Sequence, residues 1–231
     1  MRGILITNSM GKKKRVGLFG GSFNPLHYGH LRAAEEVKDI VNLDRIIFIP
    51  SSVHPVKKDK NIIDPKHRLK MIRLATDDNE FFEVSDVEMK RPGPSYTIDT
   101  LKYYREKHKD YETYFILGTE NLARIDTWKD YKELFNYSNF AVIYRPGFNF
   151  NRIEEIIPSS LSKQFRLYGD TEEMVIYRHK SGNSLIFFKI RGIKISSTTV
   201  RNLVKKGKSI KYFVPESLNK YILKQNLYTG V

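Results

Sequence analysis

The stretch GLFGGSFNPLHYGHL, Gly17 to Leu31, decides how this sequence is interpreted. Its first residues belong to a short apolar run that ends in two glycines, which predicts a buried strand over Arg15–Gly20. A helical pattern follows, and two histidines, His27 and His30, stand three positions apart where it begins. Metal binding, proton transfer and phosphate binding are the three chemistries that would use imidazoles and glycines together at such a point.

A phosphate site accounts for most of this stretch. Gly20 and Gly21 let the backbone approach a ligand closely, and the N-terminus of a helix attracts anions. His27 and His30 share one face of the entering turn, and each can donate a hydrogen bond to a phosphate oxygen. A zinc site would need a third protein ligand, and a general base would need a substrate proton within reach. A structural pair, with one histidine capping the helix and the other packing, is the remaining alternative.

The rest of the chain alternates short apolar runs with helical patterns. Further strands are expected over Arg45–Pro50, Phe81–Ser85, Glu112–Gly118, Asn139–Tyr144 and Leu185–Ile190, and helices over His30–Asn42, Asp64–Asp77, Tyr96–His108, Ser196–Lys206 and Pro215–Lys224. This alternation predicts an α/β fold with a doubly wound, mostly parallel sheet and helices on both faces. Ligands of such sheets bind beyond the carboxyl ends of the strands.

Length and composition narrow the class of protein. The 231 residues suffice for one sizeable domain, which we place at residues 15–231. We expect residues 1–14 to be a disordered extension, with Met10 as an alternative start, and residues 148–183 to be an elaborated connection within the domain. The chain has no cysteine, which excludes disulfides and thiolate chemistry. No apolar run is long enough to span a membrane.

The segment GGSFNPLHYGH resembles the nucleotidylyltransferase signature G-x-F-x-P-x-H-x-G-H. The resemblance implies a Rossmann-like fold with the C-terminal helices packed on the nucleotide side. It also implies that a substrate phosphate attacks the α-phosphorus of a nucleoside triphosphate, with Mg²⁺ as cofactor and no covalent enzyme intermediate. His27 and His30 would then be catalytic, and the phosphate loop would be formed by Gly20, Gly21, Ser22 and Phe23.

A second motif, KISSTTVR at Lys194–Arg201, places hydroxyls and a guanidinium at a helix start. Free N–H groups, hydroxyls and an arginine can converge there on one anion. A simple serine cap with a surface arginine is the alternative. The motif resembles I-S-S-T-x-x-R of the same superfamily, which implies that Ser197 and Thr198 bind phosphate and that Arg201 is catalytic.

Two further segments concern the acceptor. RPGPSYTIDTL at Arg91–Leu101 and ILGTENLARIDTW at Ile116–Trp128 resemble segments of bacterial nicotinate-mononucleotide adenylyltransferases. The resemblance implies that ATP and nicotinate mononucleotide give nicotinate adenine dinucleotide and pyrophosphate. It assigns Gly118 and Glu120 to ATP, and it assigns Lys57, Tyr96, Thr97, Trp128 and Arg145 to the mononucleotide. Because the first N–H groups of a helix lack intrahelical partners, Tyr96 and Thr97 suit the pyridine carboxylate, and the Trp128 ring would stack on the pyridine.

Some residues depart from the family pattern, and some alternatives stay open. Asn24 and Glu120 stand where the family usually has aspartate, and Val56 stands where it usually has histidine, with His54 two residues earlier. Nicotinamide mononucleotide and phosphopantetheine are alternative acceptors. The net charge of +14 also suits a nucleic-acid-binding module, although no such motif is present. We expect a cytoplasmic enzyme with no nucleic-acid or membrane partner and no protein-held metal, and homo-oligomerisation is left open.

Overall fold

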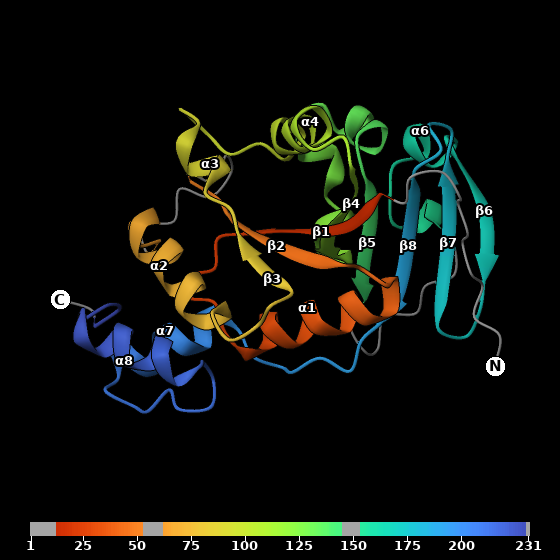
Figure 1. Ribbon diagram of the computed structural model, residues 1–231. Helices are drawn as coiled ribbons and strands as arrows, with labels where there is room; N and C mark the ends of the chain where they lie inside the picture. The colour runs from red at the N-terminus through yellow and green to blue at the C-terminus, as the bar shows by residue number, and fades with distance from the viewer. Residues whose placement is uncertain (1–12, 53–61, 145–152, 230–231) are drawn as a thin grey trace.

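A computed structural model describes residues 13–52, 62–144 and 153–229 (Figure 1). The strands are β1 (Lys14–Gly21), β2 (Arg45–Pro50), β3 (Phe82–Val84), β4 (Tyr111–Gly118), β5 (Asn139–Tyr144), β6 (Phe165–Asp170), β7 (Met174–His179) and β8 (Ser184–Lys189). The α-helices are α1 (Tyr28–Val41), α2 (Pro65–Thr76), α3 (Val87–Lys90), α4 (Thr97–Lys107), α5 (Thr119–Leu122), α6 (Ser159–Ser162), α7 (Ser197–Lys205) and α8 (Glu216–Lys224). Short 3₁₀ turns are η1 (Ile125–Thr127), η2 (Tyr131–Asn136) and η3 (Ile153–Glu155).

The strands form one sheet in the order β3-β2-β1-β4-β5-β8-β7-β6. The six strands from β3 to β8 in that order are parallel, and β7 and β6 add an antiparallel hairpin. The strand order reverses beside β1, because β2 and β3 lie on one side of it and β4 and β5 on the other. Ligands of open α/β sheets bind at this switch point, beyond the carboxyl ends of β1 and β4. The predicted Rossmann-like sheet is therefore confirmed.

Alternate residues of the central strands feed two cores, one on each face of the sheet. On β2, Ile47 and Ile49 belong to the core under α4, whereas Ile46 and Phe48 belong to the core under α1. Figure 1 shows α1 and α4 on opposite faces. This alternation follows from the two-residue period of a strand, and apolar residues at both positions produce the continuous apolar runs of buried parallel strands. Gly17 of β1 contributes no side chain to either core, because neighbouring side chains fill the space beside it. A Cβ there would lie 2.9 Å from Ile116 and from Leu43.

The C-terminal helices pack together against α2. In Figure 1, α7 and α8 lie together beside α2. The Ser217 hydroxyl of α8 donates to the Leu74 carbonyl of α2 at 2.7 Å, and His67 and Tyr221 are joined by a hydrogen bond of 2.8 Å. None of the helices in the described residues is long and apolar enough to cross a membrane.

Each expected strand and helix is confirmed to within two residues at each end. The hairpin of β6 and β7 was not expected, and it lies inside the expected connection 148–183. The sequence gives this hairpin no clear pattern because Arg166, Leu167 and Tyr168 of β6 are all exposed. The register also shifts between Leu167 and Gly169, which interrupts the two-residue period. Lys14 belongs to β1 and not to the extension, and residues 1–12 lie outside the described part.

Candidate functional site

The two histidines lie where the first strand passes into the first helix. β1 ends at Gly21, and α1 begins after His27, whose backbone is extended (φ −151°, ψ 170°) and which is the N-cap residue. His30 lies in the first turn of α1. The two imidazole rings are stacked with their centroids 3.8 Å apart and their planes 23° apart. The structure therefore brings His27 and His30 together at the switch point of the sheet.

Both imidazoles are held in an apolar setting. His30 packs edge-on against Phe23 at 5.2 Å and Phe19 at 6.2 Å between ring centroids, and His27 is only 4% exposed. Burial lowers the pKa of His27 to about 4, and burial together with the charge of His27 holds the pKa of His30 well below its usual range. Both Nδ1 atoms are buried without a hydrogen-bond partner among the described residues. Each ring is therefore neutral, and a neutral imidazole still carries one N–H that can donate a hydrogen bond.

The phosphate loop between the strand and the helix has one unusual backbone residue. Phe23 has a positive φ of 44°, which is unfavourable for a residue with a side chain. Its ring is 2% exposed and packs under Gly21, where a Cβ would lie 3.1 Å from the ring. Gly21 is therefore needed so that the loop can fold over an aromatic side chain.

The second motif begins helix α7 with a capping serine. The Ser196 hydroxyl accepts a hydrogen bond from the Thr199 backbone N–H at 3.0 Å, and the two hydroxyls are 2.8 Å apart. The serine cap, which the sequence offered as the alternative to an anion site, is present, and it satisfies one of the N–H groups that a helix start leaves unpaired.

Two hydrogen bonds join α7 to the phosphate loop across more than 170 residues of sequence. The Ser197 hydroxyl donates to the Pro25 carbonyl at 2.8 Å. Arg201 donates from Nη1 to the Asn24 carbonyl at 2.7 Å and from Nη2 to the Thr198 hydroxyl at 3.3 Å. The two segments that the sequence predicts as anion sites therefore lie next to each other, joined through the carbonyls of Asn24 and Pro25.

Asn24, which departs from the family pattern, lies at the centre of this contact. Its side-chain oxygen accepts a hydrogen bond from the Tyr228 hydroxyl at 2.9 Å and one from the Ile63 backbone N–H at 3.4 Å. Burial holds the pKa of Tyr228 above its usual value, so the phenol stays protonated and donates this bond. Asn24 thus ties the C-terminal segment to the phosphate loop.

The acceptor segment lies at the start of α4. Tyr96 is its N-cap residue, so the N–H groups of Tyr96 and Thr97 have no partner within the helix. The Lys129 ammonium lies 4.8 Å from the centroid of the Tyr96 ring and 3.4 Å from the Asp99 carboxylate, so its charge is paired within the first turn of α4. Trp128 is half-buried, with its ring edge-on to Phe115 at 6.1 Å and 89°. The structure therefore makes Trp128 partly a packing residue and leaves part of its ring accessible.

Gly118 and Glu120, which the resemblance assigns to ATP, lie at the end of β4 and the start of α5. Gly118 ends β4 beside β1, and Glu120 follows in the first turn of α5, where its carboxylate folds back toward Gly118. Lys57 and Arg145 lie outside the described residues, as do His54 and Val56.

One residue that sequence reasoning missed is Arg68. It is fully buried on α2 and donates to the carbonyl oxygen of Ser22 in the phosphate loop at 2.8 Å. In the sequence it stands among other charged residues of an amphipathic helix, as a surface arginine would. The only signal is its position on the apolar side of that helix, one turn before the buried Ile72.

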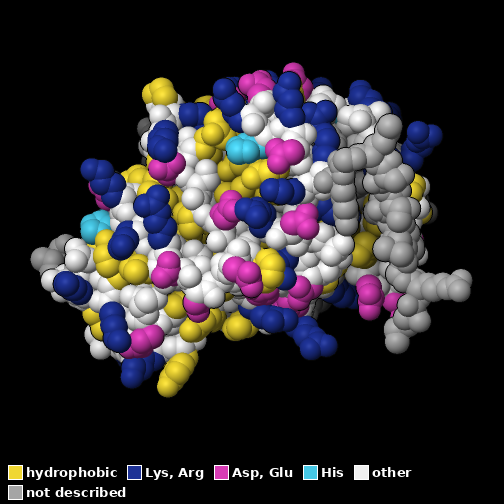
Figure 2. All heavy atoms as spheres, in the orientation of Figure 1, with side chains coloured by type: hydrophobic (Ala, Val, Ile, Leu, Met, Phe, Trp, Pro, Cys, Tyr) yellow, Lys and Arg dark blue, Asp and Glu magenta, His cyan; other side chains and the backbone are white. Residues whose placement is uncertain are grey.

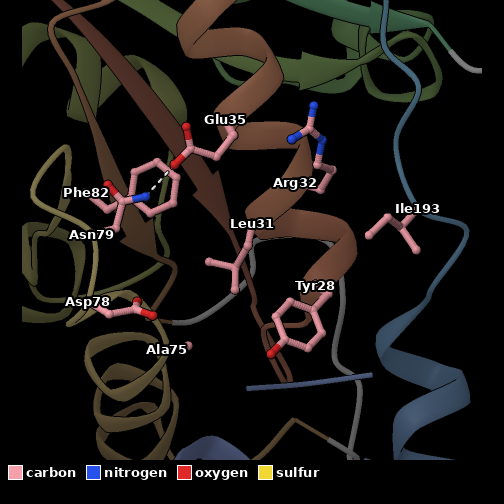
Figure 3. A pocket seen from close by; sticks show the side chains of 9 residues that line it. All are labelled: Tyr28, Leu31, Arg32, Glu35, Ala75, Asp78, Asn79, Phe82 and Ile193. Carbon is pink, nitrogen blue, oxygen red and sulfur yellow. Dashed lines mark hydrogen bonds between the residues drawn. The ribbon is translucent and has the colours of Figure 1, made fainter. Parts of the chain in front are cut away.

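A hollow of about 250 Å³ lies on the outer side of α1 (Figure 3). Tyr28, Leu31 and Arg32 of α1 line it together with Phe82 and Ile193. No predicted site residue lines it, so it is separate from the site described above. The face in Figure 2 carries basic and acidic side chains interspersed, without a single basic patch.

Comparison with known proteins identifies the family. The model of the cytidylyltransferase-like family matches residues 18–203. A protein of Clostridium novyi with the name "Probable nicotinate-nucleotide adenylyltransferase" is 41% identical, covering 93% of this chain and 99% of its own length. The chain belongs to the nicotinate-nucleotide adenylyltransferase family. A second family member of that name, from Geobacter metallireducens, is 39% identical over 93% of this chain and 98% of its own.

Solved structures share the fold of this adenylyltransferase. The Plasmodium falciparum nicotinic acid mononucleotide adenylyltransferase complexed with NaAD has a TM-score of 0.69 and 22% identity, covering 94% of this chain and 98% of its own. A second structure of the Plasmodium enzyme, complexed with APC, has a TM-score of 0.68. At this identity the likeness establishes the Rossmann-like fold.

We expect acidification to destabilise the free adenylyltransferase through its buried histidines. The folded chain keeps His27 neutral down to a pKa of about 4, whereas an unfolded chain takes up protons near pH 6.5. The stabilising contribution is therefore complete above pH 6.5 and is lost as the pH falls toward 4, by about 3 kcal/mol for His27. Urea unfolding at a series of pH values measures it. A His27→Gln variant should lose less stability over this range, and an equal loss in both proteins would contradict the assignment.

Proposed function

We propose that this adenylyltransferase transfers the adenylyl group of ATP to nicotinate mononucleotide, giving nicotinate adenine dinucleotide and pyrophosphate. Family membership over almost the whole chain gives the reaction class. The observation that carries the assignment of the site is the joining of the stacked histidines to the α7 terminus through Arg201 and Asn24. A triphosphate between these two half-sites would lie at the switch point of the sheet, where nucleotides bind in this fold.

The reaction needs positioning and charge stabilisation more than proton transfer. The attacking group is a phosphate oxygen of the mononucleotide, which is already anionic, so no base is required to activate it. The oxygen forms a bond to the α-phosphorus while the bond to the leaving pyrophosphate breaks, and negative charge grows on the pyrophosphate. In our proposal the imidazole N–H groups of His27 and His30 donate to the phosphate oxygens, and Arg201, Ser197 and Thr198 stabilise the pyrophosphate.

Magnesium enters this proposal with the substrate. Enzymes that transfer nucleotidyl groups from ATP generally need a divalent metal ion, and Mg²⁺ is the ion that we propose. Within the described ranges, no three histidine, aspartate, glutamate or cysteine side chains are placed to hold a metal ion. We therefore write the substrate as Mg-ATP, in which the ion would reduce the negative charge of the triphosphate. A cytoplasmic location remains part of the proposal, because ATP is available there.

The acceptor site follows from the start of α4. The N–H groups of Tyr96 and Thr97, which have no partner within the helix, suit the pyridine carboxylate of nicotinate mononucleotide. A carboxamide offers a weaker acceptor and brings two donors of its own toward these N–H groups. The pairing therefore favours the nicotinate form over the nicotinamide form.

Steady-state pyrophosphate release tests the proposed acceptor. The purified enzyme with Mg-ATP is assayed separately with nicotinate mononucleotide, nicotinamide mononucleotide and phosphopantetheine. We expect the first to react fastest, at least about tenfold above the carboxamide in kcat/KM, as a charge-assisted hydrogen bond would give. Equal rates with the carboxylate and the carboxamide would contradict a carboxylate site at α4, and a preference for phosphopantetheine would contradict the proposed acceptor altogether.

Trp128 supplies a prediction about the acceptor alone. Replacing it by leucine removes the aromatic face but keeps an apolar side chain against Phe115. We expect Trp128→Leu to raise the KM for nicotinate mononucleotide about tenfold, the size of one aromatic stacking contact. The KM for ATP should stay within about twofold, since the ring serves the acceptor only. Tyr131→Leu, at a nearby aromatic residue, is the control, and a change confined to the ATP KM would contradict the role of Trp128.

A further inference from the structure

Arg68 is a buried charge that the proposed chemistry does not use. It lies in α2 with none of its surface exposed, and it is the largest fully buried side chain of the described residues. Burial lowers its pKa from the usual arginine value, but a guanidinium remains protonated at neutral pH. Among the ion pairs of the described residues none includes Arg68. The Asp64 carboxylate favours the charge of Arg68 without forming an ion pair with it, so a charge buried in this way needs further compensation.

Backbone carbonyls of three separate segments provide this compensation. Arg68 donates from Nη1 to the Ser22 carbonyl at 2.8 Å, from Nη2 to the Ser52 carbonyl at 3.0 Å and from Nε to the Ile63 carbonyl at 3.2 Å. Ser22 belongs to the phosphate loop, and Ser52 follows the carboxyl end of β2. The planar guanidinium fork fixes the directions of these bonds, which a lysine ammonium could not do.

The bond to Ser22 determines how the phosphate loop is oriented. In a trans peptide the carbonyl and the following N–H point in opposite directions. Because Arg68 holds the Ser22 carbonyl on the buried side, the N–H of Phe23 is turned to the other side of the loop. Phe23 itself has the unfavourable φ of 44°, so this loop conformation needs external support. Arg68 provides that support from below the loop.

The bond to Ser52 extends the same network to the acceptor segment. The Ser52 backbone N–H donates to the Ser95 hydroxyl at 2.8 Å, one residue before Tyr96. Ser95 also favours the charged form of Glu88, a carboxyl whose pKa burial raises. Ser52 therefore accepts from Arg68 on one side and donates toward the acceptor segment on the other, so that one residue lies between the two substrate sites.

We propose that Arg68 is a positioning residue that fixes the phosphate loop and the acceptor segment relative to each other, so that the two bound substrates meet in line. This inference rests on the proposed function, since it concerns the distance between the triphosphate and the attacking phosphate. Arg68 acts on the reaction rate through Ser22 and Ser52, without touching either substrate. Its loss should therefore lower kcat while each substrate still binds separately.

The test compares Arg68→Met and Arg68→Lys with Arg73→Met, which removes an exposed arginine from the same helix. For each variant, kcat is measured by pyrophosphate release, and the Kd of a non-hydrolysable ATP analogue and of nicotinate mononucleotide is measured separately by calorimetry. We expect Arg68→Met to lower kcat about a hundredfold, as a misplacement of about 1 Å would. Both Kd values should change by less than about fivefold. Arg68→Lys should lie between wild type and Arg68→Met, and Arg73→Met should equal wild type.

A second variant, at the half-buried Ser95, keeps the proposal testable if Arg68→Met does not fold. Ser95→Ala removes the acceptor of the Ser52 N–H, and it should lower kcat about tenfold with both Kd values retained. A kcat within about threefold of wild type in Arg68→Met, or in Ser95→Ala where Arg68→Met does not fold, would overturn the inference. So would a loss of kcat fully matched by weaker binding of both substrates. Wild-type enzyme without activity on this substrate pair would instead overturn the proposed function.

Discussion

Replacing His30 by alanine is expected to lower kcat about 10²–10³-fold, the usual cost of removing one preorganised donor to a developing charge. His30 is placed for this role by its stack on His27 and by the edge-on rings of Phe19 and Phe23, which hold the imidazole in one orientation. Because the ring is already fixed before substrate binds, little reorganisation is needed during the reaction. Pyrophosphate release at saturating ATP and acceptor measures the effect.

A matched control for His30 exists elsewhere in the chain. His108 also lies in an aromatic stack, with its ring 4.7 Å from Tyr111 and 5.4 Å from Tyr104, at the far end of α4. His108→Ala should therefore leave kcat unchanged while it removes the same kind of ring contact. If His30→Ala keeps its turnover within a few-fold of wild type, the histidines do not cradle the triphosphate and are a structural pair.

Arg201 carries the second large expected effect. Arg201→Met should lower kcat/KM for ATP about 10²–10³-fold, because it removes a charge-assisted donor to the pyrophosphate and the bond to the Asn24 carbonyl. Arg201→Lys should recover only part of this loss, since an ammonium cannot serve the carbonyl, the Thr198 hydroxyl and a phosphate together. Steady-state kinetics with ATP varied gives both values.

Lys205 provides the comparison for Arg201. It lies on the same helix, is exposed, and has a side chain of the same charge. Lys205→Met controls for the loss of one positive charge near the site, and it should change kcat/KM for ATP less than about threefold at physiological salt. Equal losses in Arg201→Met and Lys205→Met would mean that net charge draws in the substrate and that Arg201 has no specific part.

The sequence predicts the local structure of the candidate site well where one segment contains all the information. The glycines, the histidine spacing and the helix start of Gly17–Leu31 are local features. The structure places them at the switch point of the sheet, where β1 ends and α1 follows. The second half-site was also predicted from local signals, the Ser196 cap and the first-turn Arg201. That these two segments lie together was expected only from the resemblance, since no pattern along the chain shows that Arg201 reaches Asn24.

Other features were not predictable because they depend on three-dimensional contacts. Arg68 has the same spacing and neighbours as a surface arginine, and only the fold turns its guanidinium toward three carbonyls. The β6–β7 hairpin has little apolar alternation, since it adds to an edge of the sheet and its outer strand stays exposed. Trp128 packs edge-on against Phe115 and keeps part of its ring exposed, which the sequence alone does not indicate.

The most direct test of this account follows the α-phosphorus of ATP. The enzyme is incubated with ATP labelled at the α-phosphate and with nicotinate mononucleotide, and the label is traced in protein, nucleotide and dinucleotide fractions. Direct attack predicts one labelled dinucleotide for each pyrophosphate released, no label on the denatured protein, and no pyrophosphate without the acceptor. Label retained on the protein, or pyrophosphate released in the absence of nicotinate mononucleotide, would contradict direct transfer between two substrates held by the histidine pair and α7.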